Sequence, residues 1–449
     1  MNQEIFTKLL FEKAKSKNIH NVEVHMTKLS SMNINVFDGS LEKFVIAEEN
    51  KLSVRGIYNG RMAYSYTEKL EKESLEELFN NLIQYAENNH NGPIEEISPM
   101  NNNMVSQTRT NNLDRYSQEE KINYLLDLEK RAYGVDKRVK TISQCSYRQV
   151  KEEVFIKNTN GLDLSDSHTI GIINLGAVTE EGGSMQTGYS HHVFNDFDED
   201  YKDQLIKESI GDALVMLGAK SIEPASKKVI LRNNVAADLF SNYLKMFYGS
   251  SVQKNLSLMK GKIGNQVAVE GLNIIEDPCM VLGKVYRTFD DEGTPTYKKH
   301  IIKDGILKTY LHNKKTGKLD GIESTGNAFR DSHKSSIAIL PTNSYLQEGD
   351  TSLDDMIKTM EDGVIITDIH GLHAGINPTS GDFSLSANGL LVEDGQIIRP
   401  IAQITVAGNF ISMLNNIKHI GNDTKYCNPN GNYFGSPSIC VLGLSISGK

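Results

Sequence analysis

The chain has 449 residues, of which 39% are apolar and 23% charged, a composition typical of a folded protein with room for two or more domains. A net charge of −9 disfavours general binding to nucleic-acid phosphates, and no apolar run is long enough to span a bilayer. Because the first residues also lack the features of a signal peptide, we expect a cytoplasmic protein without a nucleic-acid or membrane partner.

The first hundred residues combine helical and strand-like patterns. Alternating apolar residues predict two strands, over residues 22–26 and 32–36, and Asp38-Gly39 and Asn59-Gly60 predict tight turns. Ser74 is the expected N-cap of a second helix, which a polar stretch of residues 88–112 follows as a loop or linker. A helix is also predicted at the start of the chain from apolar residues at helical spacing: Ile5, Leu9, Leu10 and Ala14.

The middle of the chain begins with a third predicted helix, because Ser117 and Glu120 form a capping box. Strand patterns return over residues 138–194, and a helix is expected over residues 198–217. The composition then shifts toward turns and strands. We therefore predict an α+β fold with an N-terminal domain of helices and antiparallel strands (residues 1–220) and a mainly β C-terminal domain (residues 221–449).

Only two helices are expected in the second half, near residues 233–248 and 353–360. The first follows the strand-like run 228–231, and its apolar stripe predicts core packing: Val235, Leu239, Tyr243 and Phe247. A catalytic zinc in a protease usually needs two imidazoles one helical turn apart and a nearby carboxylate. No histidine lies between His192 and His300, and His-Glu occurs nowhere as a dipeptide. This helix therefore cannot be such a metal helix.

Three segments of the second half carry a resemblance to a known family. They are Phe289-Asp-Asp-Glu-Gly-Thr-Pro-Thr296, then Ser324-Thr-Gly-Asn-Ala328 with Arg330, then residues 371–389 with Asn377-Pro-Thr-Ser-Gly-Asp-Phe383, followed by Val406-Ala-Gly-Asn409. Their order and spacing resemble the TldD/PmbA family, also called modulators of DNA gyrase. The resemblance extends to Val54-Arg-Gly56 and Asn59-Gly-Arg61 in the first half.

The resemblance implies one of two branches. The TldD branch carries a His-Glu-x-x-x-His helix and a cysteine near the C-terminus that together hold a catalytic metal, whereas the PmbA or TldE branch lacks the histidines and pairs with a TldD-like subunit. The assembly processes or degrades small or unfolded peptides. Without the histidines, this chain resembles the PmbA/TldE branch, so zinc is expected in the TldD-like partner and none in this chain. Cys427 lies near the family's cysteine, but its surroundings differ, and we carry no ligand role over to it.

The strongest carboxylate cluster is Asp290, Asp291 and Glu292. Such a cluster can bind a metal or act in acid–base chemistry. Carboxylates just before Gly293 and Pro295 can equally cap a turn by accepting backbone N–H bonds, and we favour the turn. Contact with a substrate or partner is the functional role left to these three residues.

The second candidate is the segment His370-Gly371-Leu372-His373, with Gly375 after it. The glycines argue against a helix and suit a loop that another backbone approaches closely. Contact with substrate or partner is the preferred functional role for His370, Gly371, His373 and Gly375, and an exposed loop without a role is an equal alternative. His191 and His192 are adjacent, so on a strand they point to opposite faces and cannot easily share an ion.

Three hypotheses follow for the function. The first is a subunit without catalytic residues of its own that pairs with a TldD-like metallopeptidase, with a homodimer possible when it is alone. The second is an autonomous metal-dependent hydrolase in which His370, His373 and the Asp290–Glu292 carboxylates converge on one ion. The third is a protein-binding modulator of DNA gyrase, as the family's other label implies.

Overall fold

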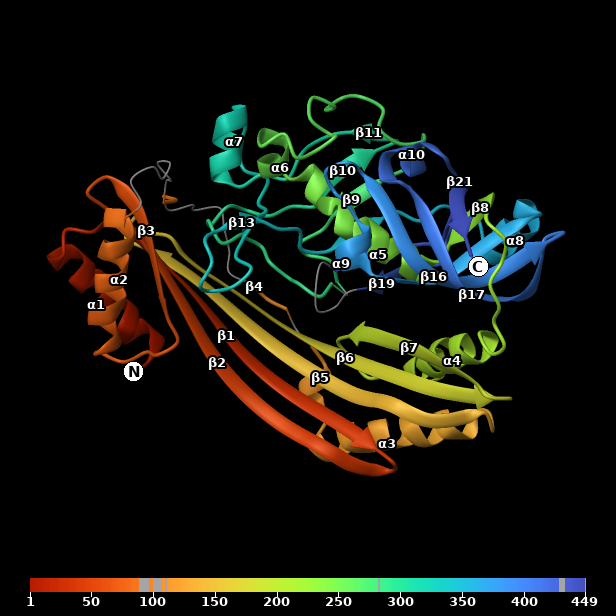
Figure 1. The fold of residues 1–449 in the computed structure, drawn as a ribbon. Helices are drawn as coiled ribbons and strands as arrows, with labels where there is room; N and C mark the ends of the chain where they lie inside the picture. The colour runs from red at the N-terminus through yellow and green to blue at the C-terminus, as the bar shows by residue number, and fades with distance from the viewer. Residues whose placement is uncertain (89–96, 100–106, 110, 282, 428–432, 449) are drawn as a thin grey trace.

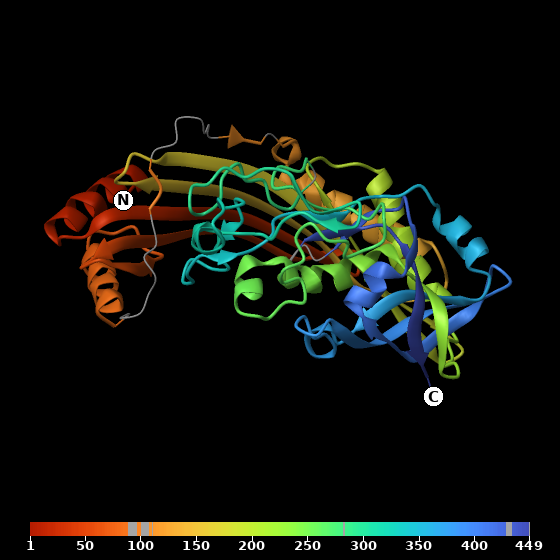
Figure 2. The ribbon, with the colours of Figure 1, turned by 90° about the horizontal axis from the view of Figure 1, so that it is seen from above.

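The computed structural model describes residues 1–88, 97–99, 107–109, 111–281, 283–427 and 433–448. A long curved sheet from the first half of the chain carries the second half on its inner face (Figure 1). Seen from above, the loops and helices of the second half lie over the strands of this sheet (Figure 2). The fold contains both helices and antiparallel sheets, which confirms the predicted α+β class.

The N-terminal sheet has the strand order β3-β2-β1-β5-β6-β4, and β7 also pairs with β6. Its strands are β1 (His20–Phe37), β2 (Ser40–Tyr58), β3 (Arg61–Thr67), β4 (Gln107–Thr108), β5 (Val139–Asn158), β6 (Asp163–Glu181) and β7 (Ser184–Phe194). The two strands predicted over residues 22–36 are in fact the single strand β1. The intervening residues stay paired with β2 on one side and β5 on the other, so a break in the apolar alternation does not end the strand.

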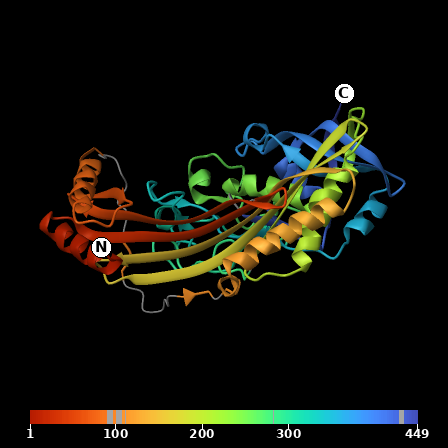
Figure 3. The same cartoon turned by 90° about the horizontal axis from the view of Figure 1, so that it is seen from below.

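Helices cover the outer face of this sheet, two near one end and one near the other (Figure 3). They are α1 (Gln3–Ser16), α2 (Ser74–Asn88) and α3 (Gln118–Gly134), and α4 (Asp200–Val215) packs against β6 and β7. The Ser117–Glu120 capping box is confirmed. Ser74 is the first residue of α2 and not its N-cap, because its hydroxyl donates to the carbonyl oxygens of Lys69 and Glu71.

The C-terminal half contains a barrel with the strand order β17-β16-β15-β8-β21-β18, and pairing of β17 with β21 closes it. The strands are β8 (Ala225–Leu231), β15 (Gly363–His370), β16 (Asp382–Glu393), β17 (Gln396–Asn409), β18 (Ile417–Ile420) and β21 (Ile439–Ser447). The helix α5 (Asn233–Tyr243) follows β8 directly, and its predicted stripe of Val235, Leu239 and Tyr243 is buried, as is Phe247 in the short 3-10 helix η2 (Leu244–Phe247).

The C-terminal half also contains a second sheet, which is built from short strands. Its order is β11-β10-β9-β14-β20-β19, and β12 and β13 form a separate pair. The strands are β9 (Ile274–Glu276), β10 (Lys299–Lys303), β11 (Ile306–Leu307), β12 (Ala328–Phe329), β13 (Ala338–Ile339), β14 (Ser344–Leu346), β19 (Lys425–Cys427) and β20 (Phe434–Ser436).

The helix predicted near residues 353–360 is confirmed as α8 (Leu353–Met360). Four further helices in this half were not predicted: α6 (Gly249–Gln253), α7 (Lys314–Asp320), α9 (Leu372–Gly375) and α10 (Phe410–Asn415). Each has one or two turns, which is too short to show an apolar period. None of the helices in the described residues is both long and apolar enough to cross a membrane.

Candidate functional site

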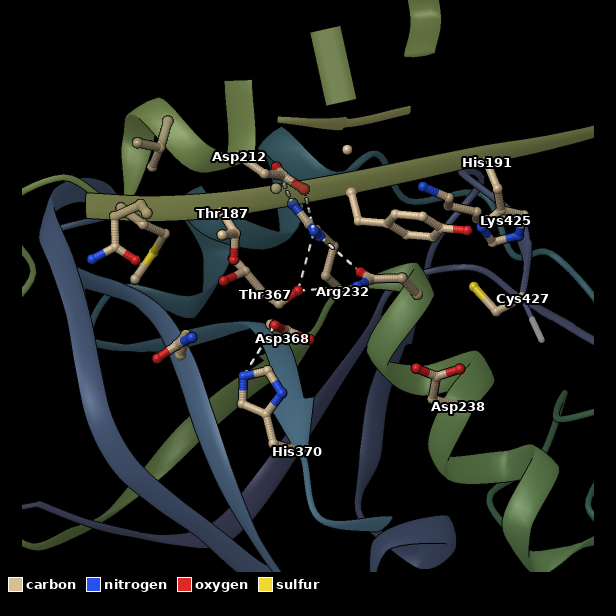
Figure 4. Close-up of a pocket in the computed structure, with 18 of the residues that line it drawn as sticks. Thr187, His191, Asp212, Arg232, Asp238, Thr367, Asp368, His370, Lys425 and Cys427 are labelled. Atoms are coloured by element: carbon tan, nitrogen blue, oxygen red, sulfur yellow. Dashed lines mark hydrogen bonds and ion pairs between the residues drawn. The ribbon is translucent and has the colours of Figure 1, made fainter. Parts of the chain in front are cut away.

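A cleft of about 780 Å³ lies between the N-terminal sheet and the barrel. One wall comes from β5, β6, β7 and α4 and the other from α5, β15, β16 and β19, so both halves of the chain build it (Figure 4). Polar and charged side chains from both walls face one another: Thr187, His191, Asp212, Arg232, Asp238, Thr367, Asp368, His370, Lys425 and Cys427.

Arg232 joins the two walls of the cleft. Its two terminal nitrogens lie 2.6 and 2.7 Å from the carboxylate oxygens of Asp212 on α4, and one of them also donates to the carbonyl of Thr367 at 3.1 Å. The Asp212 carboxylate raises the pKa of Arg232 against the opposing effect of burial. A bidentate guanidinium–carboxylate pair fixes geometry as well as charge, so Arg232 holds α4 against β15.

The start of α5 faces the same cleft with amide side chains. Asn233 donates to the carbonyl of Asp423 at 2.7 Å, and Asn234 donates to the carbonyl of Thr367 at 3.0 Å. Asn233, Asn234 and Asp238 have the spacing of the first, second and sixth residues of a His-Glu-x-x-x-His motif. The amide of Asn234 is therefore committed to β15, and the amide of Asn233 to the loop before β19.

Cys427 on β19 lines the cleft on the side of α5. Burial raises the pKa of its thiol to about 12, so it is protonated near neutral pH. Lys425 beside it pairs with Glu208 of α4 at 2.6 Å. Among the described residues no three His, Cys, Asp or Glu side chains lie close enough to hold an ion, so the residues of this cleft do not fit a catalytic zinc.

His191 belongs to this cleft, although no functional role was predicted for it. Its Nε2 lies 3.0 Å from the carbonyl oxygen of Tyr426, and burial lowers the pKa of its imidazole to about 4, with Lys425 adding to the effect. His192 points away and stacks against Tyr201 of α4 at a ring distance of 4.0 Å. The predicted opposite orientation of the two imidazoles is confirmed, and the alternation of β7 was the available signal that one of them faces the second half.

His370 ends β15 at the rim of the cleft, with a side chain 57% exposed and its Nε2 3.2 Å from Asp368 Oδ2. The prediction that the following residues form no helix is wrong, because α9 is one helical turn that begins after Gly371 at a φ of +80°. Gly375 does permit a close backbone approach, since a Cβ there would lie 2.4 Å from the carbonyl oxygen of Ser384. His373 is exposed on α9. Contact of these residues with substrate or partner stays a prediction.

The three carboxylates Asp290, Asp291 and Glu292 lie elsewhere, buried between the loop that bears them and the N-terminal sheet, with exposed fractions of 0%, 3% and 3%. Asp290 accepts the N–H groups of Glu292 and Thr294, which confirms the turn that the sequence favoured. Asp290 and Asp291 are enclosed, whereas Glu292 lines a separate cavity of about 370 Å³ together with Ser98 and Lys314. Contact of these three carboxylates with substrate or partner stays a prediction.

The positions of the buried carboxylates also contradict the second hypothesis, that of an autonomous metal-dependent hydrolase. Asp291 lies 3.0 Å from His25 of β1, whereas His370 pairs with Asp368 at the cleft. The site that the hypothesis requires is therefore not formed, and the described residues contain no group of three that would replace it. The autonomous hydrolase built on these residues is a wrong prediction, because the two clusters are held by different partners.

Comparison with known proteins agrees with this architecture along almost the whole chain. Models of the PmbA/TldA metallopeptidase family match residues 22–86 as domain 1, residues 111–217 as the central domain and residues 224–448 as the C-terminal domain. A metalloprotease TldD homolog of Buchnera aphidicola is 26% identical over 436 residues, covering 91% of this chain and 89% of the relative. Metalloprotease PmbA of Escherichia coli O157:H7 is 28% identical over 308 residues, covering 68% and 66%.

Two solved structures share the fold. One, from Thermotoga maritima and described as a putative modulator of a DNA gyrase, superposes with a TM-score of 0.88 at 28% identity, covering 99% of this chain and 100% of that chain. TldE from Thermococcus kodakarensis also gives a TM-score of 0.88, at 21% identity and the same coverage. Relatives of the TldD and PmbA types match at similar identity, so the branch has to be argued from the residues of the cleft.

Proposed function

The chain belongs to the PmbA/TldD metallopeptidase family, and we propose that it is a PmbA/TldE-like subunit of a two-component enzyme that processes or degrades small or unfolded peptides. In this proposal a TldD-like subunit with a His-Glu-x-x-x-His helix supplies the zinc and the bond cleavage. This chain helps to enclose and hold the peptide.

The start of α5 is the observation that carries the proposal. It bears Asn233, Asn234 and Asp238, and the two amides donate to backbone carbonyls of the loop before β19 and of β15. An amide is a poor replacement for an imidazole as a zinc ligand, and in the described part of the chain Cys427 belongs to no group of three His, Cys, Asp or Glu side chains that could hold an ion. The cleft keeps the shape of a peptide-sized site while its polar groups serve to join the two halves of the chain.

The extent of the cleft supports a role in holding peptide. It is lined by Gln186, Thr187, Gly188 and Tyr189 of β7, by Gly176 of β6 and by Ser143 and Gln144 of β5. Tyr189, Gly176 and Gln144 are register partners on neighbouring strands, so the cleft crosses these strands of the N-terminal sheet. In this proposal an extended peptide lies across the strands, between the sheet and the barrel.

The test is reconstitution with a TldD-like paralogue from the same organism. Metal content is measured first on each subunit purified without chelators, and we expect zinc in the paralogue and not in this chain. Cleavage of an unstructured peptide is then compared for each subunit and for the mixture. Activity that rises only in the mixture supports the subunit role. Stoichiometric zinc in this chain, or a mixture no more active than the paralogue alone, contradicts it.

A cleft variant sharpens the same experiment. Tyr189→Ala removes a ring that lines the cleft and is 51% exposed, and we expect the KM of the mixture for peptide to rise several-fold with a smaller change in kcat. Tyr297→Ala is the matched control, because this ring is equally exposed at 51% and does not line the cleft. Equal effects of the two substitutions would remove the assigned role of the cleft.

A further inference from the structure

A second groove, of about 700 Å³, lies at the far end of the N-terminal sheet from the cleft. It contacts three consecutive residues of β3, Tyr64, Ser65 and Tyr66. Because consecutive side chains of a strand point to opposite faces, a groove that contacts all three lies along the edge of the strand. In the described part of the chain β3 pairs only with β2, so this edge is the outer one of the sheet.

The helix α2 forms one bank of the groove. Its lining residues recur at intervals of four, three, one and three, which places them on one face of the helix: Glu77, Asn81, Gln84, Tyr85 and Asn88. Tyr85 meets Tyr64 edge to face at a ring distance of 5.6 Å, so the helix is packed directly beside the strand edge. An edge strand flanked by a helix is a geometry in which an extended chain can lie.

The second bank is a loop of the C-terminal half, residues 333–335. The hydroxyl of Ser53 on β2 donates to the carbonyl of His333 at 2.7 Å, which fixes this loop to the sheet. The ring of His333 meets that of Tyr66 edge to face at 5.4 Å, and the ammonium of Lys334 lies 5.3 Å from the centre of the same ring. The groove therefore has aromatic side chains on both banks.

Ser65 adds a buried polar group beside the groove. It lines the groove and is only 7% exposed, and its hydroxyl has no hydrogen-bond partner among the described residues. A buried hydroxyl without a partner costs free energy, which an ordered water would offset.

We propose that this groove binds an extended peptide segment, which adds as a strand to the outer edge of β3 between α2 and the loop of residues 333–335. Main-chain groups of the peptide pair with β3, and its side chains alternate between the bank that bears Tyr85 and the bank that bears Tyr66 and His333. The inference rests on the proposed function for its ligand class, and it adds a second peptide site outside the cleft.

The test measures binding of a fluorescent heptapeptide of alternating valine and threonine to the full chain purified alone, by fluorescence anisotropy. The length matches the seven residues of β3. A peptide N-methylated at every second residue keeps one free edge and is expected to bind within about threefold of the unmethylated peptide. Methylation of every residue blocks both edges and should abolish binding. Equal loss with both methylated peptides, or no binding of the parent, overturns the proposal.

A pair of adjacent substitutions on α2 locates the site. Asn81→Trp fills the groove, and we expect the affinity to fall by at least about tenfold. Asn80→Trp is the matched control, because Asn80 is exposed on the same helix but does not line the groove. Circular dichroism melting establishes that both variants fold. Equal affinities of the two variants would place the peptide elsewhere, and a chain dimer that only Asn81→Trp dissociates would assign the groove to a second copy.

This readout is separate from that of the proposed function. The anisotropy experiment uses no partner subunit and no cleavage, whereas the reconstitution measures cleavage by the pair. If the groove does not bind the heptapeptide, the subunit proposal is unaffected. If the reconstituted pair does not cleave peptide, the effect of Asn81→Trp on heptapeptide binding can still be measured.

Discussion

Charged side chains are buried where the loop of residues 287–292 meets the N-terminal sheet. Arg55 of β2 has no exposed surface and lies 2.7 Å from Glu23 of β1, while Asp291 pairs with both His25 and Arg287. The neighbouring cations hold the pKa of Asp291 well below its usual range, against the effect of burial. Each ion depends on its partner, because an unpaired charge in this environment is strongly unfavourable.

At the residue scale, Arg55→Met is expected to lower the free energy of unfolding by about 3–5 kcal/mol, because it leaves Glu23 buried without its cation. Urea denaturation measures the change. Lys157→Met is the control. The side chains of Lys157 and its partner Asp163 are 48% and 67% exposed, so this ion pair is expected to contribute little to the free energy of unfolding. Similar losses for both variants would mean that the burial of Arg55 has no energetic consequence.

The imidazole of His191 makes stability depend on pH. Burial lowers its pKa to about 4 in the folded chain from an ordinary value of 6.5, so acidification protonates the unfolded chain first. This contribution to the free energy of unfolding is fully present above about pH 6.5, where His191 is neutral in the folded and the unfolded chain. It is lost as the pH falls toward 4.

We expect His191→Gln to reduce the fall in unfolding temperature between pH 7 and pH 4.5, because glutamine does not bind a proton in this range. Glutamine also keeps a donor for the carbonyl of Tyr426, with which His191 Nε2 is in contact at 3.0 Å. Thermal unfolding across this range measures the effect, and the exposed His20→Gln serves as the matched substitution. If the unfolding temperatures of wild type and His191→Gln fall in parallel with pH, the imidazole of His191 does not contribute to the pH dependence of stability.

At the scale of elements, the contact between α4 and β7 depends on one missing side chain. A Cβ at Gly188 would lie 1.9 Å from the carbonyl oxygen of Ser209, so the helix can rest on the strand only where the strand bears glycine. Gly188 also lines the cleft. Gly188 therefore determines how closely α4 packs on β7, and it also forms part of one wall of the cleft.

Gly188→Ala is expected to destabilise the chain by about 1–3 kcal/mol, because the new methyl group forces α4 away from β7. Gly211→Ala on α4 is the control with the opposite expected sign. A Cβ at Gly211 meets no atom within 4 Å, and alanine favours a helix over glycine by about 0.5–1 kcal/mol. Chemical denaturation measures both changes. Stabilisation by Gly188→Ala would show that the helix and strand are not in close contact.

The sequence predicted elements where the signal is local. The capping box of Ser117 and Glu120, the turns at Asp38-Gly39 and Asn59-Gly60, and the helix of residues 353–360 each depend on a few neighbouring residues, and each is present. The length of β1 was not predictable, because residues 27–31 lack an apolar alternation and are held by pairing on both sides.

The cleft could not be predicted from the sequence, because residues far apart in the chain form it together. Its residues come from eight separate segments of the described chain, within residues 143–144, 176, 186–191, 212–216, 232–238, 367–370, 388–390 and 425–427. Alternation along β7 shows that His191 and His192 face opposite sides, but it does not show which side meets Cys427. The buried position of Asp290 could be suspected from its turn, whereas the pairing of Asp291 with His25 joins residues from opposite halves of the chain.

On the scale of the whole molecule, the two halves share their cores. Phe289 of the second half is fully buried in a cluster with Val154, Ile156, Leu162 and Leu164 of the first half. Tyr433 likewise packs with residues of β6 and β7. Because these apolar clusters cross the predicted boundary near residue 220, we expect the stability of each half to depend on the other.

This coupling can be measured with two phenylalanines of equal burial, Phe289 and Phe6, which are both 0% exposed. Phe6 packs only within the first half, and either Phe→Ala substitution is expected to cost about 3–5 kcal/mol. If the chain unfolds as one unit, both variants lower hydrogen-exchange protection in the slowest amides of both halves. If Phe6→Ala lowers protection in the first half alone, the halves unfold separately. One cooperative unit suits a cleft whose walls belong to different halves, because the distance between the walls is then maintained by the stability of the entire chain.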